Sequence, residues 1–360
     1  MAGHAPLPET ARVLDTGLRP AVQNVALSRA LLEARAAAEI PDTLRFLRHA
    51  PSALLDCGQS AAQEFELEAC DAAGVGLQRR ITHGPALVVG EGDLAWELCL
   101  HRDRLDADPD TAARRLCNAA AAALRELGVA AYLRAHNEIA VEGRRLAATA
   151  CAVDGPVLLF EGCVRVEAEA GACTRLRLPG AASAAARLAA VRERSTSLAA
   201  LLGRAPPLAQ IRAVLTEAFE SELAVECSEG DLTLSEHSRY QRALAEMSTE
   251  GWVQFATAAR ERTPQGAGNT RHAGGVLRTA VIHDLDSGRL KQVWLLGDVP
   301  LRPRAVSFDL ETALAGVPLN RIERVVERYV AERPGALNGM RSADLAAAIR
   351  AATQAVLIAR

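Results

Sequence analysis

Lysine is almost absent from this chain. Its 360 residues include 41 lysine and arginine residues together, and Lys291 is the single lysine, so 40 are arginine. The chain therefore has no Gly-Lys-Ser/Thr phosphate-binding loop. Lys291 lies within a segment whose pattern predicts a strand, so it is not the exposed lysine at the tip of a carrier hairpin. Chemistry that needs an amine from this chain has one candidate residue.

Other scarcities narrow the protein class. Aromatic residues make up 3% of the chain, which predicts a core of Leu, Val and Ala. No apolar run approaches the roughly 20 residues that span a bilayer. The eight cysteines form no Cys-x-x-Cys pair, and the first residues lack the pattern of a secretory signal, so we expect reduced, mostly buried thiols in a cytoplasmic protein. A net charge of −3 argues against nucleic acid as a partner, and nothing indicates a membrane.

The hydrophobic pattern predicts an α/β fold of the α+β type, with a mixed, largely antiparallel sheet and flanking helices. The paired prolines Pro206 and Pro207 interrupt the pattern. We therefore predict a first domain over 1–203 and a smaller α+β domain over 204–360. The predicted helices of the first domain span 22–38, 61–72, 109–127 and 184–202.

Three segments carry residues suited to chemistry. In the first, Arg79 and Arg80 end a strand and lead into the small-residue turn 82–86, where arginines and backbone N–H groups could bind an anion. The alternative is an ordinary connecting loop. The second is the hairpin 137–150, and the alternative there is a solvated charged tip. In the third, Gly162 interrupts a strand, which predicts a bulge or a close approach of another group.

Together the three segments resemble the lipoate-protein ligases of the biotin/lipoate ligase superfamily in order and spacing. The matching positions are Arg79, Arg80, Thr82, Gly84, Ala86, Asn137, Ile139, Val141, Gly143, Arg144, Thr149, Ala150 and Gly162. The resemblance implies the catalytic-type fold of that family with a C-terminal accessory domain. It also implies formation of acyl-AMP from lipoate or octanoate, with ATP and Mg²⁺, and transfer of the acyl group to a lysine of a lipoyl carrier protein.

The resemblance also implies roles for individual residues. Arg145 stands at the position of the family's catalytic lysine, and its guanidinium cannot accept a proton. No spaced ligand set predicts a resident metal, and the Mg²⁺ that accompanies ATP is expected near Glu138. Acyl and adenylate binding falls to Arg79, Arg80, Thr82, His83, Gly84, Pro85, Ala86, Asn137, Glu138, Gly143, Ala148, Thr149 and Gly162.

Three hypotheses remain open from the sequence. The first is a lipoate or octanoate ligase with a remodelled site. The second is a cysteine-dependent octanoyl or lipoyl transferase, in which Cys151 or Cys163 is the nucleophile and Arg145 favours the thiolate; the alternative for both thiols is burial in the core. The third is a member of the family that binds an acyl group, an adenylate or a carrier without turnover.

Overall fold

The structure is a computed structural model. It describes residues 10–56, 59, 61–105, 108–135, 137–167, 183–254, 265–272, 275–284, 287–297, 299, 301, 304–337 and 339–358. The chain divides into two compact units, 1–257 and 258–360. Among the residues described, no helix is both long and apolar enough to cross a membrane.

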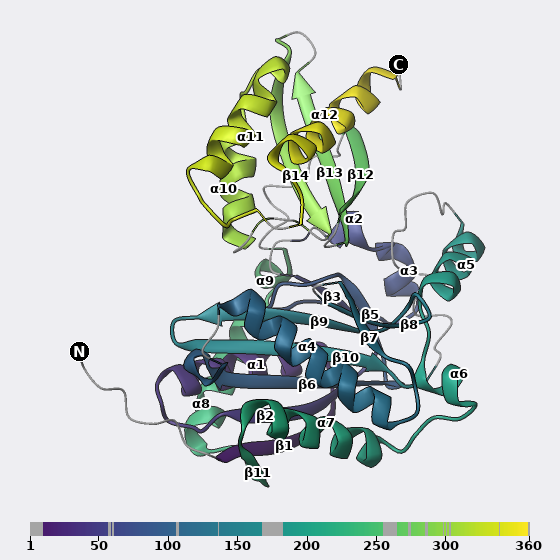
Figure 1. Cartoon of the computed structure of the whole chain (residues 1–360), viewed down its shortest axis with the longest axis vertical. Coiled ribbons are helices and arrows are strands. Elements are labelled where there is room, and N and C mark those ends of the chain that lie inside the picture. Colours follow the sequence, from purple (N-terminus) through teal and green to yellow (C-terminus); the bar gives the residue numbers. More distant parts are fainter. Residues whose placement is uncertain are drawn as a thin grey trace. The chain divides into compact units, whose positions relative to one another are not determined.

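An eight-stranded sheet forms the centre of the first unit (Figure 1). Its strand order is β11-β1-β2-β6-β10-β9-β8-β7. The β11–β1 and β1–β2 pairs are parallel, and the other neighbours are antiparallel. The strands are β1 (Thr10–Arg19), β2 (Thr43–His49), β6 (Asp93–His101), β7 (Tyr132–Ala135), β8 (Glu138–Val141), β9 (Arg144–Asp154), β10 (Val157–Arg165) and β11 (Glu226–Glu229).

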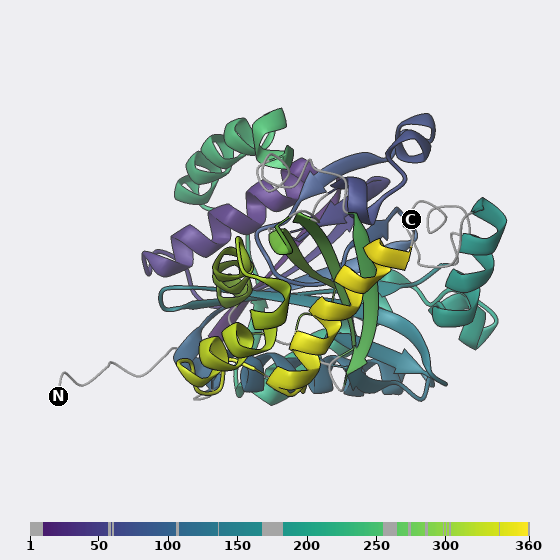
Figure 2. The same cartoon turned by 90° about the horizontal axis from the view of Figure 1, so that it is seen from above.

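Helices cover both faces of this sheet. On one face α4 (Pro109–Glu126) and α7 (Leu208–Leu223) pack against each other over the main core, which includes Phe46, Leu98 and Phe160. On the other face α1 (Ala21–Ala36) packs beside α8 (Leu234–Met247), as Figure 2 shows. Alternation along the strands separates the two faces, since successive side chains point in opposite directions.

A second, three-stranded sheet of order β4-β3-β5 completes the site-bearing part of this unit. Its strands are β3 (Ser52–Leu55), β4 (Gly76–Arg79) and β5 (Leu87–Val89). The remaining helices of the unit are α2 (Ala61–Glu64), α3 (Leu67–Ala72), α5 (Ala184–Arg194), α6 (Leu198–Leu202) and α9 (Glu250–Gln254), with a 3₁₀ turn at Arg102–Leu105.

The second unit has its own sheet and its own core. The antiparallel strands β12 (Gly266–His272), β13 (Gly275–Asp284) and β14 (Arg289–Gly297) form the sheet. Helix α12 (Ser342–Ile358) lies across β12 and β13, while α10 (Arg304–Leu314) packs on β14 (Figures 1 and 2). Helix α11 (Ile322–Ala331) packs on α12, after a 3₁₀ turn at Leu319–Arg321.

The mixed, largely antiparallel sheet with flanking helices confirms the predicted fold class. The division between units differs from the predicted boundary at 203/204. Pro206 and Pro207 do end one helix, but α7 packs back on α4, β11 pairs with β1, and α8 packs on α1. Residues 204–257 therefore belong to the first unit.

Candidate functional site

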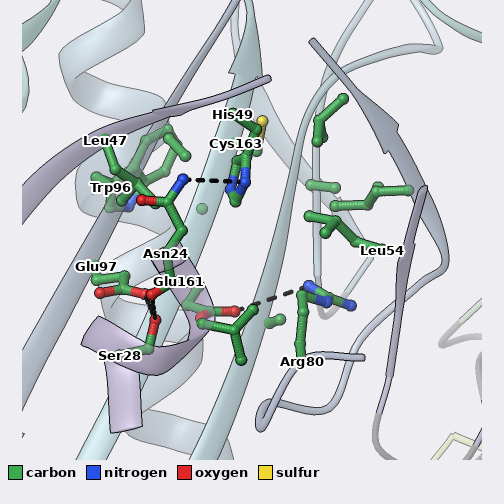
Figure 3. Close-up of a pocket in the computed structure, with 17 residues that line it drawn as sticks. Asn24, Ser28, Leu47, His49, Leu54, Arg80, Trp96, Glu97, Glu161 and Cys163 are labelled. Atoms are coloured by element: carbon green, nitrogen blue, oxygen red, sulfur yellow. Dashed lines mark hydrogen bonds and ion pairs between the residues drawn. The ribbon is translucent and has the colours of Figure 1, made fainter. Parts of the chain in front are cut away.

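A cavity opens on the α1 face of the large sheet. We call it the inner cavity. Its walls come from α1, the large sheet and the small sheet, as Figure 3 shows for Asn24, Trp96 and Leu54. The apolar side chains include Leu47, Leu54, Leu87 and Val89. The polar side chains are Asn24, Ser28, His49, Arg80, Glu97 and Glu161.

One end of the inner cavity rests on three charged residues from neighbouring strands. Arg45, Glu97 and Glu161 lie opposite one another on β2, β6 and β10. The Arg45 Nε lies 2.9 Å from Glu97 Oε2, and Ser28 Oγ donates a hydrogen bond to Glu97 Oε1. Burial raises the pKa of Glu97 to about 8; the neighbouring carboxylate of Glu161 adds to the rise and Arg45 opposes it. The protonated form of Glu97 is therefore favoured at neutral pH.

Arg80 and Thr82 reach the same end from the segment that follows strand β4. Thr82 Oγ1 donates a hydrogen bond to Glu161 Oε2, and Arg80 Nη1 lies 3.8 Å from the same oxygen. Arg80 Nη2 donates to the carbonyl of Pro85 at 2.9 Å. Arg80 Nε is buried and has no hydrogen-bond partner. Two predicted residues, Arg80 and Thr82, thus meet at one carboxylate.

His49 is held neutral at the other side of the inner cavity (Figure 3). Asn24 Nδ2 donates to the His49 Nδ1 at 3.2 Å and to the carbonyl of Arg48 at 2.9 Å. Burial lowers the pKa of His49 to about 3, and the charges of Arg45 and Arg80 act in the same direction. The imidazole proton therefore resides on Nε2.

The segment between Arg80 and β5 is pinned onto β9. The backbone N–H of His83 donates to the carbonyl of Cys151 at 2.8 Å, and the N–H of Cys151 donates back at 3.1 Å. A β-carbon on Gly84 would lie 2.7 Å from the Ala150 Cβ, so only glycine fits this approach. Pro85 and Ala86 follow in the same segment. The N–H of His83 is thus used in pairing with β9, and Pro85 has no N–H to offer an anion.

Arg145 lies in a second pocket, which we call the outer pocket. It also contains Asp93, Arg165 and Thr196. The two pockets share a wall made of Leu87, Val89, Ala148 and Cys163. The Arg145 guanidinium therefore lies on the other side of this shared wall from the inner cavity.

Both oxygens of Glu138 are engaged by arginines. Arg145 Nη1 lies 3.4 Å from Glu138 Oε1, and Arg134 Nη2 lies 2.6 Å from Glu138 Oε2. Mg²⁺ requires anionic or neutral oxygen ligands, and two guanidinium groups at this carboxylate oppose a further cation. The residues at Glu138 do not fit the Mg²⁺ expected there. Among the described residues, no cluster of three or more His, Cys, Asp or Glu side chains could hold a metal.

The two candidate thiols differ in position. Cys163 lines both pockets, and burial raises the pKa of its thiol strongly, although Arg165, Arg80 and Arg145 oppose the rise. Cys151 packs against the main core under α4 and lines neither pocket. A reactive thiol needs an accessible thiolate. The raised pKa of Cys163 disfavours its thiolate, and Cys151 lies outside both pockets.

Several other predicted residues lie outside both pockets. Arg79 is buried, and its guanidinium donates to the carbonyls of Asp56, Gln59 and Val253. Thr149 Oγ1 lies 3.2 Å from the Cys117 Sγ on the α4 face. The backbone carbonyl oxygen of Asn137 accepts a hydrogen bond from the backbone N–H of Thr149. Gly143 occupies the turn of the β8–β9 hairpin with φ of 77°.

At Gly162 the structure shows a close approach of the Trp96 side chain and not a bulge. Strand β10 continues unbroken through Glu161, Gly162 and Cys163. Ala148 likewise lies in the regular strand β9, with no positive φ. The sequence did not predict Ser28, Glu97 or Glu161 as site residues. For the two glutamates the available signal was a charged residue inside a predicted strand.

Comparison with known proteins identifies the family. The family described as lipoyl protein ligase A/B catalytic domain matches residues 20–220. The chain belongs to this family. Octanoyltransferase LipM of Symbiobacterium thermophilum is 29% identical over 266 residues, which cover 67% of this chain and 97% of that protein. These matches confirm the predicted resemblance to the lipoate-protein ligases.

Solved structures with the same fold extend the family comparison. The bi-partite lipoate protein ligase from Thermoplasma acidophilum, solved as part of a lipoylation system with its E2 lipoyl domain, has a TM-score of 0.60 at 23% identity, and covers 70% of this chain and 98% of its own. P. falciparum LipL1, solved in complex with lipoate, has a TM-score of 0.66 at 12% identity and covers 95% and 99%. At these identities the likeness establishes the fold.

Proposed function

We propose that the first unit binds a lipoyl- or octanoyl-type acyl group and transfers it to a lysine of a lipoyl carrier. The observation that carries this proposal is the junction of the two pockets at Ala148 and Cys163. An acyl chain in the inner cavity would place its carbonyl at this junction, next to the outer pocket that contains Arg145. Membership of the lipoyl protein ligase family and the similarity to octanoyltransferases support the same activity.

The donor is an acyl group that is already activated, as an adenylate or a thioester. The engagement of Glu138 by Arg134 and Arg145 leaves no fitting Mg²⁺ site there. The His83–Cys151 backbone pairs and Pro85, which lacks an N–H, remove donors that could face a nucleotide. Formation of acyl-AMP from ATP, which the sequence resemblance implies, is therefore the less supported half of the reaction.

The transfer step needs a nucleophile from the carrier and a fixed charge from this chain. The neutral amine of the carrier lysine attacks the acyl carbonyl, a C–N bond forms, and the bond to the AMP phosphate oxygen or the thiol sulfur breaks. The amine loses its proton to the leaving group or to water. Arg145 can stabilise the negative charge that develops on the carbonyl oxygen or the leaving group, but it cannot accept the proton.

Binding without turnover is the second candidate. The paired Glu138 and the tight packing of the 83–86 segment against β9 favour it, since both reduce the room for a nucleotide. We further propose that the acceptor is a lipoyl carrier, that the reaction takes place in the cytoplasm, and that the acyl group has the chain length of lipoate or octanoate.

Intact mass of an apo lipoyl carrier tests these candidates. The carrier is incubated with the full chain and either octanoyl-AMP or octanoate with ATP and Mg²⁺. A gain of one octanoyl group with octanoyl-AMP alone supports the proposal. A gain with octanoate and ATP would establish the ligase instead. No gain in either reaction, with octanoate bound in a parallel calorimetric titration, would establish binding without turnover.

A further inference from the structure

The end of the inner cavity at Glu97 and Glu161 is polar, although an octanoyl chain ends in a methyl group. Glu161 faces the cavity with 15% of its side chain exposed, beside Thr82 and Arg80. Among the polar side chains of the inner cavity, the Oδ1 of Asn24 and the Nε of Arg80 are buried without a hydrogen-bond partner. A buried polar atom without a partner destabilises the complex that contains it, so a methyl group is a poor match for this end.

The distance along the sheet fits a group near the far end of a short acyl chain. Cys163 pairs with Ala95 and Ala148 across the sheet, at the wall that the two pockets share. Glu161 and Glu97 form the pair two residues further along their strands. Two strand residues span about 7 Å. A chain with its carbonyl at the junction would therefore reach Glu161 with its distal carbons.

The charge around Glu161 favours a neutral partner. Arg45 and Arg80 supply two positive charges, and the raised pKa of Glu97 reduces the negative charge that opposes them, so the four side chains carry a net positive charge at neutral pH. A further ammonium group would be repelled by the two guanidinium groups. A hydroxyl or an amide N–H can donate to a carboxylate oxygen without adding charge.

We propose that the acyl group of this site carries a neutral hydrogen-bond donor, such as a hydroxyl, near its distal end, and that Glu161 accepts the hydrogen bond. The inference rests on the proposed function, because it assumes that an acyl chain occupies the inner cavity. It names a substrate class, the distally hydroxylated or amide-bearing acyl groups, that the fold alone does not specify.

Calorimetric titration of the full chain with three matched acids tests the inference. The acids are octanoate, 8-hydroxyoctanoate and 8-aminooctanoate. We expect 8-hydroxyoctanoate to bind about 10- to 100-fold more tightly than octanoate, the range of one hydrogen bond to a charged group. We expect 8-aminooctanoate to bind no more tightly than octanoate. Octanoate binding as tightly as the hydroxy acid overturns the inference while leaving the proposed function intact, whereas no binding of any acid overturns both.

Variants at Glu161 separate recognition from general fit. In Glu161→Leu the preference for the hydroxy acid should fall to about one, since the acceptor is lost. Glu161→Gln keeps the size of the side chain and one acceptor oxygen, so we expect an intermediate preference for the hydroxy acid over octanoate. This variant provides the test if the leucine variant does not fold. The control is Glu126→Leu, at the exposed end of α4. An unchanged preference in both Glu161 variants would contradict the inference.

Discussion

Gly162 lies directly against the indole of Trp96. The two residues are opposite each other on the antiparallel strands β10 and β6, and a β-carbon on Gly162 would lie 2.0 Å from the Trp96 Cζ2. Trp96 also packs against Phe219 of α7, with ring centroids 6.5 Å apart. The indole therefore cannot move aside freely, and one glycine fixes both the core and a wall of the inner cavity.

Gly162→Ala should destabilise the first unit because its methyl group overlaps the indole. We expect a loss of about 1–3 kcal/mol in the free energy of unfolding, the usual cost of overpacking a core. Urea denaturation measures it. The control is Gly76→Ala in β4, where the nearest atom to the added β-carbon is 4.0 Å away. Equal effects of the two substitutions would contradict the close approach described here.

His49 should make the free energy of unfolding depend on pH in the acidic range. Its pKa is about 3 in the folded chain against 6.5 in the unfolded chain, so its contribution is present above pH 6.5 and is lost as the pH falls toward 3. Between pH 6.5 and 4.5 the loss is about 2 kcal/mol, because the unfolded imidazole is only half protonated at pH 6.5. His49→Leu should remove this part of the pH dependence.

Urea denaturation at several pH values measures the effect of His49. His237→Gln is the matched control, because His237 is exposed on α8. Its stability curve should run parallel to that of the unsubstituted chain. If the curve of His49→Leu also runs parallel, the imidazole is not held neutral by burial and by the hydrogen bond from Asn24.

The strands and turns that form the site were predictable from the sequence, but the charged cluster of Arg45, Glu97 and Glu161 was not. Alternation predicts the strand that contains Glu97, and turn chemistry predicts the hairpin at Gly143. The meeting of Arg45, Glu97 and Glu161 depends on the register between β2, β6 and β10, which one sequence does not specify.

Strands β12 and β11 are among those that were not predicted, for a related reason. β12 (Gly266–His272) contains glycine and asparagine, which are poor strand formers, and it forms because it pairs with β13. The short strand β11 likewise depends on parallel pairing with β1, more than 200 residues away in the chain. This pairing is also why the prolines at 206–207 did not mark the domain boundary.

Transfer should not depend on Cys163 or Cys151. Burial raises the pKa of Cys163, and Cys151 faces the main core, so neither thiol is prepared to act as a nucleophile. We expect Cys163→Ala and Cys151→Ala each to change the transfer rate from octanoyl-AMP by less than about tenfold, whereas loss of a nucleophile costs on the order of 10³-fold or more. Carrier acylation followed by mass spectrometry measures the rates. A thioester on the enzyme that disappears in either variant would restore the cysteine mechanism.

Arg145→Lys should increase acyl transfer. A lysine ammonium is compact and can lose its proton, whereas the planar guanidinium of Arg145 cannot and is bound to Glu138 at 3.4 Å. We expect a gain on the order of tenfold or more in carrier acylation, the scale of one added electrostatic contact in a transition state. Arg144→Lys is the matched control, since Arg144 pairs with Glu142 near the hairpin turn and lines neither pocket. If Arg145→Lys stays as slow as the unsubstituted chain while octanoate still binds, the block lies instead in the segment of His83 and Pro85, which is fixed against β9.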